Sequence, residues 1–377
     1  MLDTAKSRAG CLAFRGGRLL KRIAILAGDG IGPEISQATQ RVLQAVSDHH
    51  SLGLTFHPVT VGFDALRKHG STFPDAAMQE IQTCDGIVLG PVSHNAYPPR
   101  DDGGLNPSGE LRKRLDLYGN IRPARSRAGI PPRAGVPLDL IVVRENTEGF
   151  YADRNMVQGP GEMLVTEDVA IAMRKITRPA CMRIAREAFR IAKGRSGRVT
   201  AVHKANVMRT SCGLFLECCR QIAAENPEIA YQEQLVDAMC ALLVRAPDQH
   251  DVIVTTNMFG DILSDLASEL SGSLGLAASL NAGEDRAMAQ AQHGSAPDIA
   301  GQDIANPASL IGSAAMLLDW MGRRLQDKAL GTAAVAIEAA LEAVLSVPEQ
   351  RTRDLGGKNG TAAFTDAVIA ELGRGGA

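Results

Sequence analysis

Two carboxylates, Asp261 and Asp265, stand four residues apart at the start of a predicted helix that follows an apolar strand. This spacing places both on one face of the helix, where two negative charges repel each other unless a cation lies between them. Oxygen ligands of this kind suit Mg²⁺ or Mn²⁺. Helix capping and a favourable interaction with the helix dipole also explain Asp261 without any metal. The spacing alone therefore leaves a metal site and a structural role open.

Further polar groups directly follow other apolar runs. Arg144 opens the run RENTEGFY, which ends at Tyr151, and Lys204 comes just after another apolar stretch. In an α/β protein, sites form at the carboxyl ends of the strands. There, a tyrosine or a partly desolvated lysine can transfer a proton, and arginines such as Arg112, Arg122 and Arg144 can bind carboxylates in a bidentate manner. Taken singly, each of these residues is equally compatible with a solvated surface position.

Two glycine-containing segments suggest contact with a phosphate or a nucleotide. The turn Gly28–Glu34 (GDGIGPE) follows an apolar run, and glycine amides at such a place can bind phosphate. Pro33 stands where the Rossmann fingerprint has its third glycine, so that fingerprint fails, and a turn that needs positive φ explains the glycines equally well. The loop His293–Asp298 (HGSAPD) has short side chains that would let a nucleotide approach, and it is equally compatible with a simple turn.

The elements that must position these residues alternate along the chain. Short apolar runs predict strands, and apolar residues at helical spacing predict helices. The expected strands are 21–27, 86–89, 138–143, 198–203 and 251–256. The expected helices are 35–46, 111–117, 178–192, 211–224, 261–270, 333–345 and 365–372, with a loop at 355–360. This alternation indicates an α/β fold with a largely parallel sheet.

Composition narrows the class of protein. The 377 residues suffice for two domains and a large core, and the formal net charge of −2 gives no indication of nucleic-acid binding. Seven cysteines without C-x-x-C spacing favour reduced thiols in a cytoplasmic protein over a disulfide framework. We find no apolar run of membrane-spanning length and expect no membrane contact. Residues 1–20 are basic and lack the apolar core of a secretion signal, which predicts a disordered extension rather than an organelle transit peptide.

Five blocks of the sequence together resemble one family, the metal-dependent β-decarboxylating dehydrogenases, which includes isocitrate, homoisocitrate, 3-isopropylmalate, tartrate and D-malate dehydrogenases. The blocks are GDGIGPE, RLDLYGNIRP, VRENTEGFY, NMFGDILSDL and HGSAPDIAGQDIANP, and the similarity extends from about Ile23 to about Leu372. Homoisocitrate and NAD-linked isocitrate dehydrogenases are the most similar members, because they share RENTEG and HKANV. The resemblance implies the two-lobed, open-sheet α/β fold of this family, which is not a Rossmann fold. Residues 21–118 and 272–377 would form a large cofactor-binding lobe, and 119–271 a central lobe with the dimer interface.

The resemblance also implies a role for each matching residue. The malate carboxylates of the substrate would be held by Arg112, Arg122 and Arg144. Tyr151 would be the proton donor, and Lys204 of the partner subunit would help to deprotonate the substrate hydroxyl. Asp261 and Asp265 would bind Mg²⁺ or Mn²⁺ together with Asp237 of the partner subunit. The residues expected around NAD are Asn206, His293, Gly294, Ser295, Ala296, Asp298, Ile299 and Asn306.

The implied activity is NAD-dependent oxidative decarboxylation of a 3-substituted malate, a small 2-hydroxy acid, by a homodimer with shared active sites. An isocitrate- or homoisocitrate-like substrate is expected, and 3-isopropylmalate, tartrate and D-malate are the alternatives. A carboxylate at Asp298 can accept hydrogen bonds from ribose hydroxyls and would repel the extra phosphate of NADP. The presence of Tyr151, Lys204 and the aspartates argues against a non-catalytic regulatory subunit. Pro33 and the paired aspartates argue against a metal-free Rossmann dehydrogenase.

The chain departs from the family at three places. Ala289, Gln290, Ala291 and Gln292 stand where the family usually has an aromatic residue followed by Glu. In the helix that contacts the substrate's 3-substituent in this family, isocitrate enzymes carry Ser and Asn two residues apart; this chain has the two types exchanged, as Asn106 and Ser108, followed by Gly109. These two side chains offer hydrogen bonds, which favours a polar or carboxylated substituent over isopropyl. The segment Ser93–Gly104 is unlike that of the family members, so the sequence leaves the substrate open.

Overall fold

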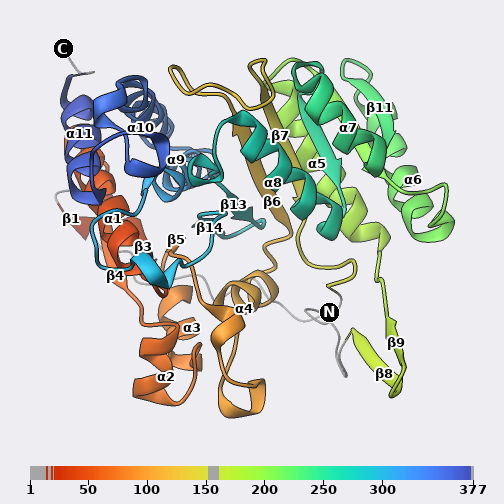
Figure 1. The fold of residues 1–377 in the computed structure, drawn as a ribbon, viewed down its shortest axis with the longest axis horizontal. Coiled ribbons are helices and arrows are strands. Elements are labelled where there is room, and N and C mark those ends of the chain that lie inside the picture. Colours follow the sequence, from red (N-terminus) through yellow and green to blue (C-terminus); the bar gives the residue numbers. More distant parts are fainter. Residues whose placement is uncertain (1–13, 16–17, 20, 152–160, 375–377) are drawn as a thin grey trace.

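A computed structural model describes residues 14–15, 18–19, 21–151 and 161–374, and ten strands of this part form one sheet (Figure 1). Their order across the sheet is β11 (Ala230–Leu235), β10 (Arg198–His203), β12 (Val252–Thr255), β7 (Asp139–Glu145), β6 (Gly119–Arg125), β13 (Leu280–Ala282), β14 (Ala287–Gln290), β5 (Gly86–Leu89), β3 (Lys21–Leu26) and β4 (Leu54–Pro58). The antiparallel pairings of this described sheet are β7 with β6, β6 with β13 and β13 with β14. The other pairings are parallel, as the alternation of elements predicts.

Alternating side chains of β7 pack against different helices on the two faces of the sheet. Leu140 and Val142 pack in one cluster with Leu263 of α8 (Asn257–Ser271) and Met239 of α7 (Val236–Arg245). Val143 packs in another cluster, which includes residues of α5 (Arg178–Lys193) and α6 (Arg209–Glu225). Because successive side chains of a strand point to opposite faces, the sheet is covered on both faces here.

The other half of the sheet is covered by helices from both ends of the chain. These are α1 (Gly32–His50), α9 (Ala308–Leu325), α10 (Lys328–Ser346) and α11 (Thr361–Arg374), which pack against one another (Figure 1). By length and composition α10 could cross a membrane, which corrects the expectation that no apolar run is long enough. Its residues Leu330, Ile337, Leu341 and Val344 are buried in the core, and a helix buried between others has the same apolar composition.

Smaller elements complete the fold. Helices α2 (Phe63–His69), α3 (Asp75–Gln82) and α4 (Pro107–Arg114) lie together beside β5 and β14, and the hairpin of β8 (Glu162–Thr166) and β9 (Val169–Ala172) projects from the body (Figure 1). Most of the predicted extension 1–20 lies outside the described residues. Within it, β1 (Phe14–Arg15) pairs with β2 (Arg18–Leu19). The five strands that residues 119–271 contribute to the ten-stranded sheet are adjacent in it, and the division into lobes remains a prediction.

Two of the helices that begin earlier than predicted bear on the site. The helix predicted at 111–117 is α4, which begins four residues earlier because Asn106 caps it: the Oδ1 of Asn106 accepts from the backbone N–H groups of Ser108 and Gly109. The helix predicted at 261–270 is α8, which begins at Asn257. Asp261 therefore lies beyond the first turn of α8. Helix capping, which explained Asp261 as well as a metal did, is wrong as an explanation of this residue.

Candidate active site

The carboxylates of α8 face a buried arginine of β6. Nη1 of Arg122 lies 3.1 Å from Oδ1 of Asp261, 3.3 Å from Oδ1 of Asp265 and 2.8 Å from Oγ of Ser264. Its Nε donates to Oδ1 of Asn120 at 3.2 Å. The Arg122 side chain is 8% exposed, whereas those of Asp261 and Asp265 are 37% and 54% exposed. Arginine thus binds both carboxylates, and both remain partly exposed to solvent.

A second buried arginine, Arg144 of β7, holds the start of α8. Its Nε and Nη2 donate to Oδ1 of Asn257 at 2.9 and 2.7 Å, and its Nη1 donates to Oδ1 of Asp261. The helix comes this close because Gly260 has no side chain: a Cβ there would lie 2.6 Å from Cβ of Arg144. Gly260 in the sequence NMFGD is therefore required by the contact between α8 and β7.

Burial and charge act against each other in this cluster. Burial lowers the pKa of Arg122, and Asp261 and Asp265 oppose that shift. Burial also raises the pKa of Asp265; Arg122 and Arg144 lower it, and the neighbouring charge of Asp261 raises it. The Asp265 carboxyl therefore holds its proton above its ordinary range, and a cation bound beside it would favour its ionised form.

Tyr151 lies next to the same carboxylate. Its hydroxyl is 3.5 Å from Oδ2 of Asp261, at the long limit of a hydrogen bond. The structure therefore brings together five of the predicted residues within one chain, namely Arg122, Arg144, Tyr151, Asp261 and Asp265.

Lys204 and Asp237 form a separate pair. Nζ of Lys204 lies 2.8 Å from Oδ1 of Asp237, and this hydrogen bond is the main cause that lowers the pKa of the aspartate. The two residues follow β10 and β11, and β10 is separated from β7 by β12. Within one chain they bind each other, and a shared site would need them from a partner subunit. Asn206 is exposed in the loop after β10.

We call Arg122, Arg144, Tyr151, Asp261 and Asp265 the α8 cluster. The register of the sheet places this cluster next to a second group of polar side chains around α4. Asn120 pairs opposite Arg144, and Asn281 of β13 pairs opposite Asn120. Opposed residues, and residues two apart on a strand, share a face, so these side chains project to the face that α8 covers. Asn281 donates in turn to Oε1 of Gln290 at 3.4 Å. The same oxygen accepts from Ser108 Oγ at 3.0 Å and from Arg112 Nη2 at 3.1 Å.

The second cluster changes the interpretation of the predicted substituent pocket. Ser108 and Arg112 are brought together, whereas the side-chain oxygen of Asn106 is used to cap α4. Sequence reasoning noted Gln290 only as a departure from the family and assigned no role to Asn120, Asn257 or Asn281. Their polar side chains on otherwise apolar strands, and at the start of α8, were the available signal.

The predicted cofactor loop lies against the glycine turn. Ile31 N–H donates to the backbone oxygen of Ser295 at 2.8 Å, and a Cβ on Gly30, whose φ is +58°, would lie 2.0 Å from that oxygen. The backbone explanation of the glycine turn is thus confirmed. Burial lowers the pKa of His293, and within the described chain its buried Nε2 has no hydrogen-bond partner. Both ends of the Asn306 amide are engaged, with Asp354 Oδ2 and with Ala308 N–H.

The remaining predicted cofactor residues lie in the same loop. Asp298 and Gly294 are exposed, Ala296 and Ile299 are half-buried, and the Oγ atoms of Ser295 and Ser93 are 2.7 Å apart. Ser93 begins the segment Ser93–Gly104, whose Ser93 N–H and Tyr97 hydroxyl both donate to Oδ2 of buried Asp29. The segment is thus anchored beside the cofactor loop.

Comparisons with known proteins identify the family to which the chain belongs. Residues 22–368 match the model of the isocitrate/isopropylmalate dehydrogenase family, and the chain belongs to this family. It is 42% identical over 353 residues to isocitrate/homoisocitrate dehydrogenase of Thermus thermophilus, covering 93% of this chain and 98% of that protein. It is 39% identical over 350 residues to 3-isopropylmalate dehydrogenase of Sulfurisphaera tokodaii, covering 93% and 97%.

A solved structure has a similar fold over nearly the whole chain. The isocitrate dehydrogenase of Methylococcus capsulatus superposes with a TM-score of 0.83 at 38% identity, covering 94% of this chain and 99% of that one. The predicted family and its α/β fold are therefore confirmed. The chain is a dehydrogenase of the family that oxidatively decarboxylates 2-hydroxy acids.

A buried carboxyl fixes the loop that leads to Tyr151. The carboxylate of Glu148 accepts from the backbone N–H and the hydroxyl of Thr177 at 2.8 and 2.9 Å, and Thr177 caps α5. The backbone oxygen of Glu148 accepts from Nδ2 of Asn257 at 2.9 Å. Burial raises the pKa of Glu148 from 4.5 to about 7; the bonds from Thr177 oppose that rise, and Glu145 adds to it.

This shift predicts a pH-dependent stability. The folded protein binds the Glu148 proton more tightly than the unfolded chain does, so this contribution to stability is present below pH 4.5 and is lost as pH rises through about 7. In denaturant unfolding between pH 5 and 8, wild type should lose stability relative to Glu148→Gln, by on the order of 2–3 kcal/mol. The exposed Glu349→Gln is the control. A constant difference between wild type and Glu148→Gln across this range would contradict the prediction.

Proposed function

We propose that the protein oxidises a 3-substituted malate with NAD and decarboxylates it in the presence of Mg²⁺ or Mn²⁺. The observation that carries this proposal is the α8 cluster, in which two buried arginines lie against two half-exposed carboxylates beside a tyrosine. Guanidinium groups bind substrate carboxylates, carboxylate oxygens bind a hard cation, and a phenol transfers a proton. Oxidative decarboxylation of a hydroxy acid needs all of these.

The residues present fit a divalent cation. Asp261 and Asp265 offer only oxygen atoms as ligands. The pKa of Asp265 is raised, and a nearby cation would lower it by stabilising the ionised carboxylate. Among the described residues there is no group of three His, Cys, Asp or Glu that could hold a metal, so a third protein ligand has to come from elsewhere. The partner subunit's Asp237 is our candidate. The cation would supply electrophilic stabilisation of the negative charge that develops on the substrate.

The chain's own residues account for orientation and proton transfer. Arg122 on β6 and Arg144 on β7 would bind the malate carboxylates of the substrate. Arg112 on α4 would also bind one of these carboxylates. Lys204, supplied by the partner, would take part in removing the hydroxyl proton during oxidation. Tyr151 would protonate the carbon that loses CO₂, for which its place beside Asp261 is suited.

The loop after β14 fits NAD. Its buried His293 Nε2 can take a hydrogen bond that the described residues leave unmade, and exposed Asp298 can accept from ribose hydroxyls. The same carboxylate would repel the 2′-phosphate of NADP. The hydride acceptor would be the nicotinamide of NAD. The polar side chains of Ser108 and Arg112 favour an isocitrate- or homoisocitrate-like substrate over 3-isopropylmalate. Tartrate and D-malate remain the alternatives.

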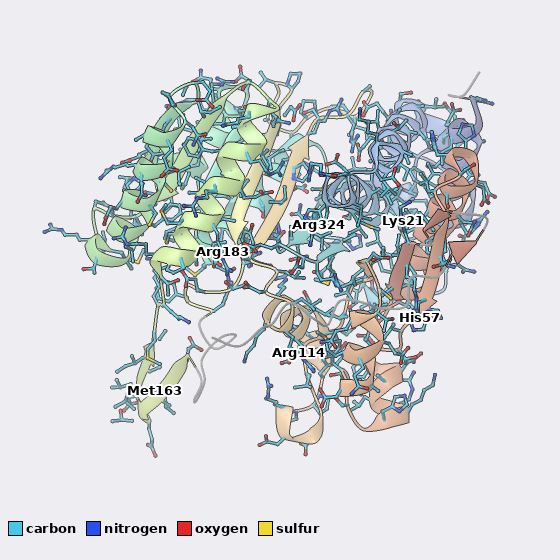
Figure 2. The ribbon with its side chains drawn as sticks, turned by 180° about the vertical axis from the view of Figure 1, so that it is seen from behind. Lys21, His57, Arg114, Met163, Arg183 and Arg324 are labelled. Atoms are coloured by element: carbon cyan, nitrogen blue, oxygen red, sulfur yellow. The ribbon has the colours of Figure 1, made fainter. Side chains whose placement is uncertain are left out.

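We also propose a homodimer with shared sites. The hairpin of β8 and β9 exposes Met163, Leu164, Val165, Val169 and Ile171, and Figure 2 shows Met163 on this hairpin, away from the body. Ile262 on α8 and Val244 on α7 are also more than half exposed. A second copy would cover these apolar side chains and bring its Lys204 and Asp237 to the α8 cluster. Free thiols throughout the described residues fit the cytoplasmic location that we propose.

A substrate screen tests the activity. Wild-type protein with Mn²⁺ and NAD should oxidise isocitrate, homoisocitrate or tartrate with a higher kcat/KM than 3-isopropylmalate, releasing NADH and CO₂ together. Activity should vanish after EDTA treatment and return with Mn²⁺, and NADP should give a kcat/KM at least roughly tenfold lower. Full activity without metal would refute the metal site, and first rank for 3-isopropylmalate would refute the polar pocket.

Subunit mixing tests the shared site. Lys204→Met and Asp261→Asn homodimers should each be inactive, because each lacks one essential group in both sites. A purified heterodimer of the two keeps one complete site and should recover about half of the wild-type activity. A verified heterodimer without activity would show that Lys204 acts within its own chain.

A further inference from the structure

Gln290 is the last residue of β14, and its side-chain oxygen accepts three hydrogen bonds from helix α4 and strand β13. They come from Ser108 Oγ at 3.0 Å, Arg112 Nη2 at 3.1 Å and Asn281 Nδ2 at 3.4 Å. Its backbone oxygen also accepts from Ser279 Oγ and Ser313 Oγ, at 2.6 and 3.0 Å. The residue is thus fixed at both its backbone and its side chain.

The contact with Arg112 determines which way the amide points. A guanidinium group only donates hydrogen bonds, so the atom that faces Arg112 has to be the amide oxygen. The amide nitrogen, Nε2, is therefore directed elsewhere, and it donates to no atom of the part of the chain that the structure describes. Gln290 is half-buried, and Nε2 is not one of the described side-chain atoms that are fully buried without a partner. This donor is therefore partly exposed, on the same residue that binds Ser108 and Arg112, both of which we assign to the substrate.

We propose that Gln290 determines substrate specificity by donating a hydrogen bond from Nε2 to an oxygen of the substrate's 3-substituent, while its Oε1 holds Ser108 and Arg112 in place. The favoured substituent carries a carboxylate or hydroxyl oxygen. A neutral amide suits an anionic substituent, because it donates without adding a negative charge beside Arg112. This inference rests on the proposed function and narrows its substrate class.

Replacement by glutamate separates the two roles of the side chain. Gln290→Glu keeps an oxygen for Ser108, Arg112 and Asn281, but it replaces the Nε2 donor with a second oxygen and adds a charge. Its carboxylate would repel a carboxylated substituent and could not donate to a hydroxyl. A bare malate has no oxygen on C3 and makes neither of these substituent interactions, so its change in kcat/KM measures only the effect of the new charge on Arg112.

The experiment compares kcat/KM for isocitrate, tartrate and D-malate in wild type and variants. In Gln290→Glu we expect kcat/KM for isocitrate to fall by at least roughly thirtyfold and for tartrate by roughly tenfold, with D-malate changing by less than about threefold. Ser108→Ala removes the hydroxyl that donates to Gln290. It should also lower kcat/KM for isocitrate more than kcat/KM for D-malate. Gln232→Glu is the control, since Gln232 is an exposed strand glutamine whose Nε2 donates to the Thr200 hydroxyl at the far edge of the sheet. Its substrate ranking should match wild type.

Two failures are distinguishable. If Gln290→Glu lowers kcat/KM for every substrate by one common factor, Gln290 only maintains the structure, and the inference is overturned while the proposed function stands. If wild type oxidises none of the three substrates or their homologues, the proposed function fails and the inference fails with it. Should Gln290→Glu not fold, an unchanged isocitrate to D-malate ratio in Ser108→Ala overturns the inference.

Discussion

The contact between the arginines of the central strands and the carboxylates of α8 is the interaction on which the rest of this structure depends. Arg122 and Arg144 are buried in the sheet face, and a buried guanidinium that loses its partner costs roughly 3–5 kcal/mol. Asp261 serves both arginines, so α8 has to approach β6 and β7 closely, which Gly260 permits. The fold thus holds the carboxylates in position while both remain partly exposed to solvent.

The antiparallel centre of the sheet carries this constraint further. It places Arg144, Asn120 and Asn281 side by side on one face, although they are far apart in the sequence. Through Asn281 and Gln290 the row reaches Ser108 and Arg112 on α4. The groups proposed to bind the common malate part and those proposed to bind the substituent are therefore joined by hydrogen bonds across neighbouring strands.

All five strands predicted from apolar runs are present, and 86–89 and 198–203 have the predicted bounds, whereas five strands of the ten-stranded sheet were not predicted: β4, β6, β11, β13 and β14. Helix α9 was not predicted, because it is buried around most of its circumference and shows no polar face. The starts of α4 and α8 were missed since Asn106 and Asn257 act through contacts that spacing does not show. Family motifs identified Arg122, Arg144 and Asp261, whereas the role of Gln290 depends on strand register, which one sequence does not determine.

Mn²⁺ binding to the intact protein tests the central claim most directly, since it requires no turnover. Titration followed by the electron paramagnetic resonance of free Mn²⁺ should show stoichiometric binding to wild type. Asp261→Asn and Asp265→Asn should each weaken it by at least roughly tenfold. Asp319→Asn, which removes a carboxylate paired with Arg323 on α9, should bind as wild type does. Equal Mn²⁺ affinity in wild type, Asp261→Asn and Asp265→Asn would contradict the assignment of the α8 carboxylates as metal ligands.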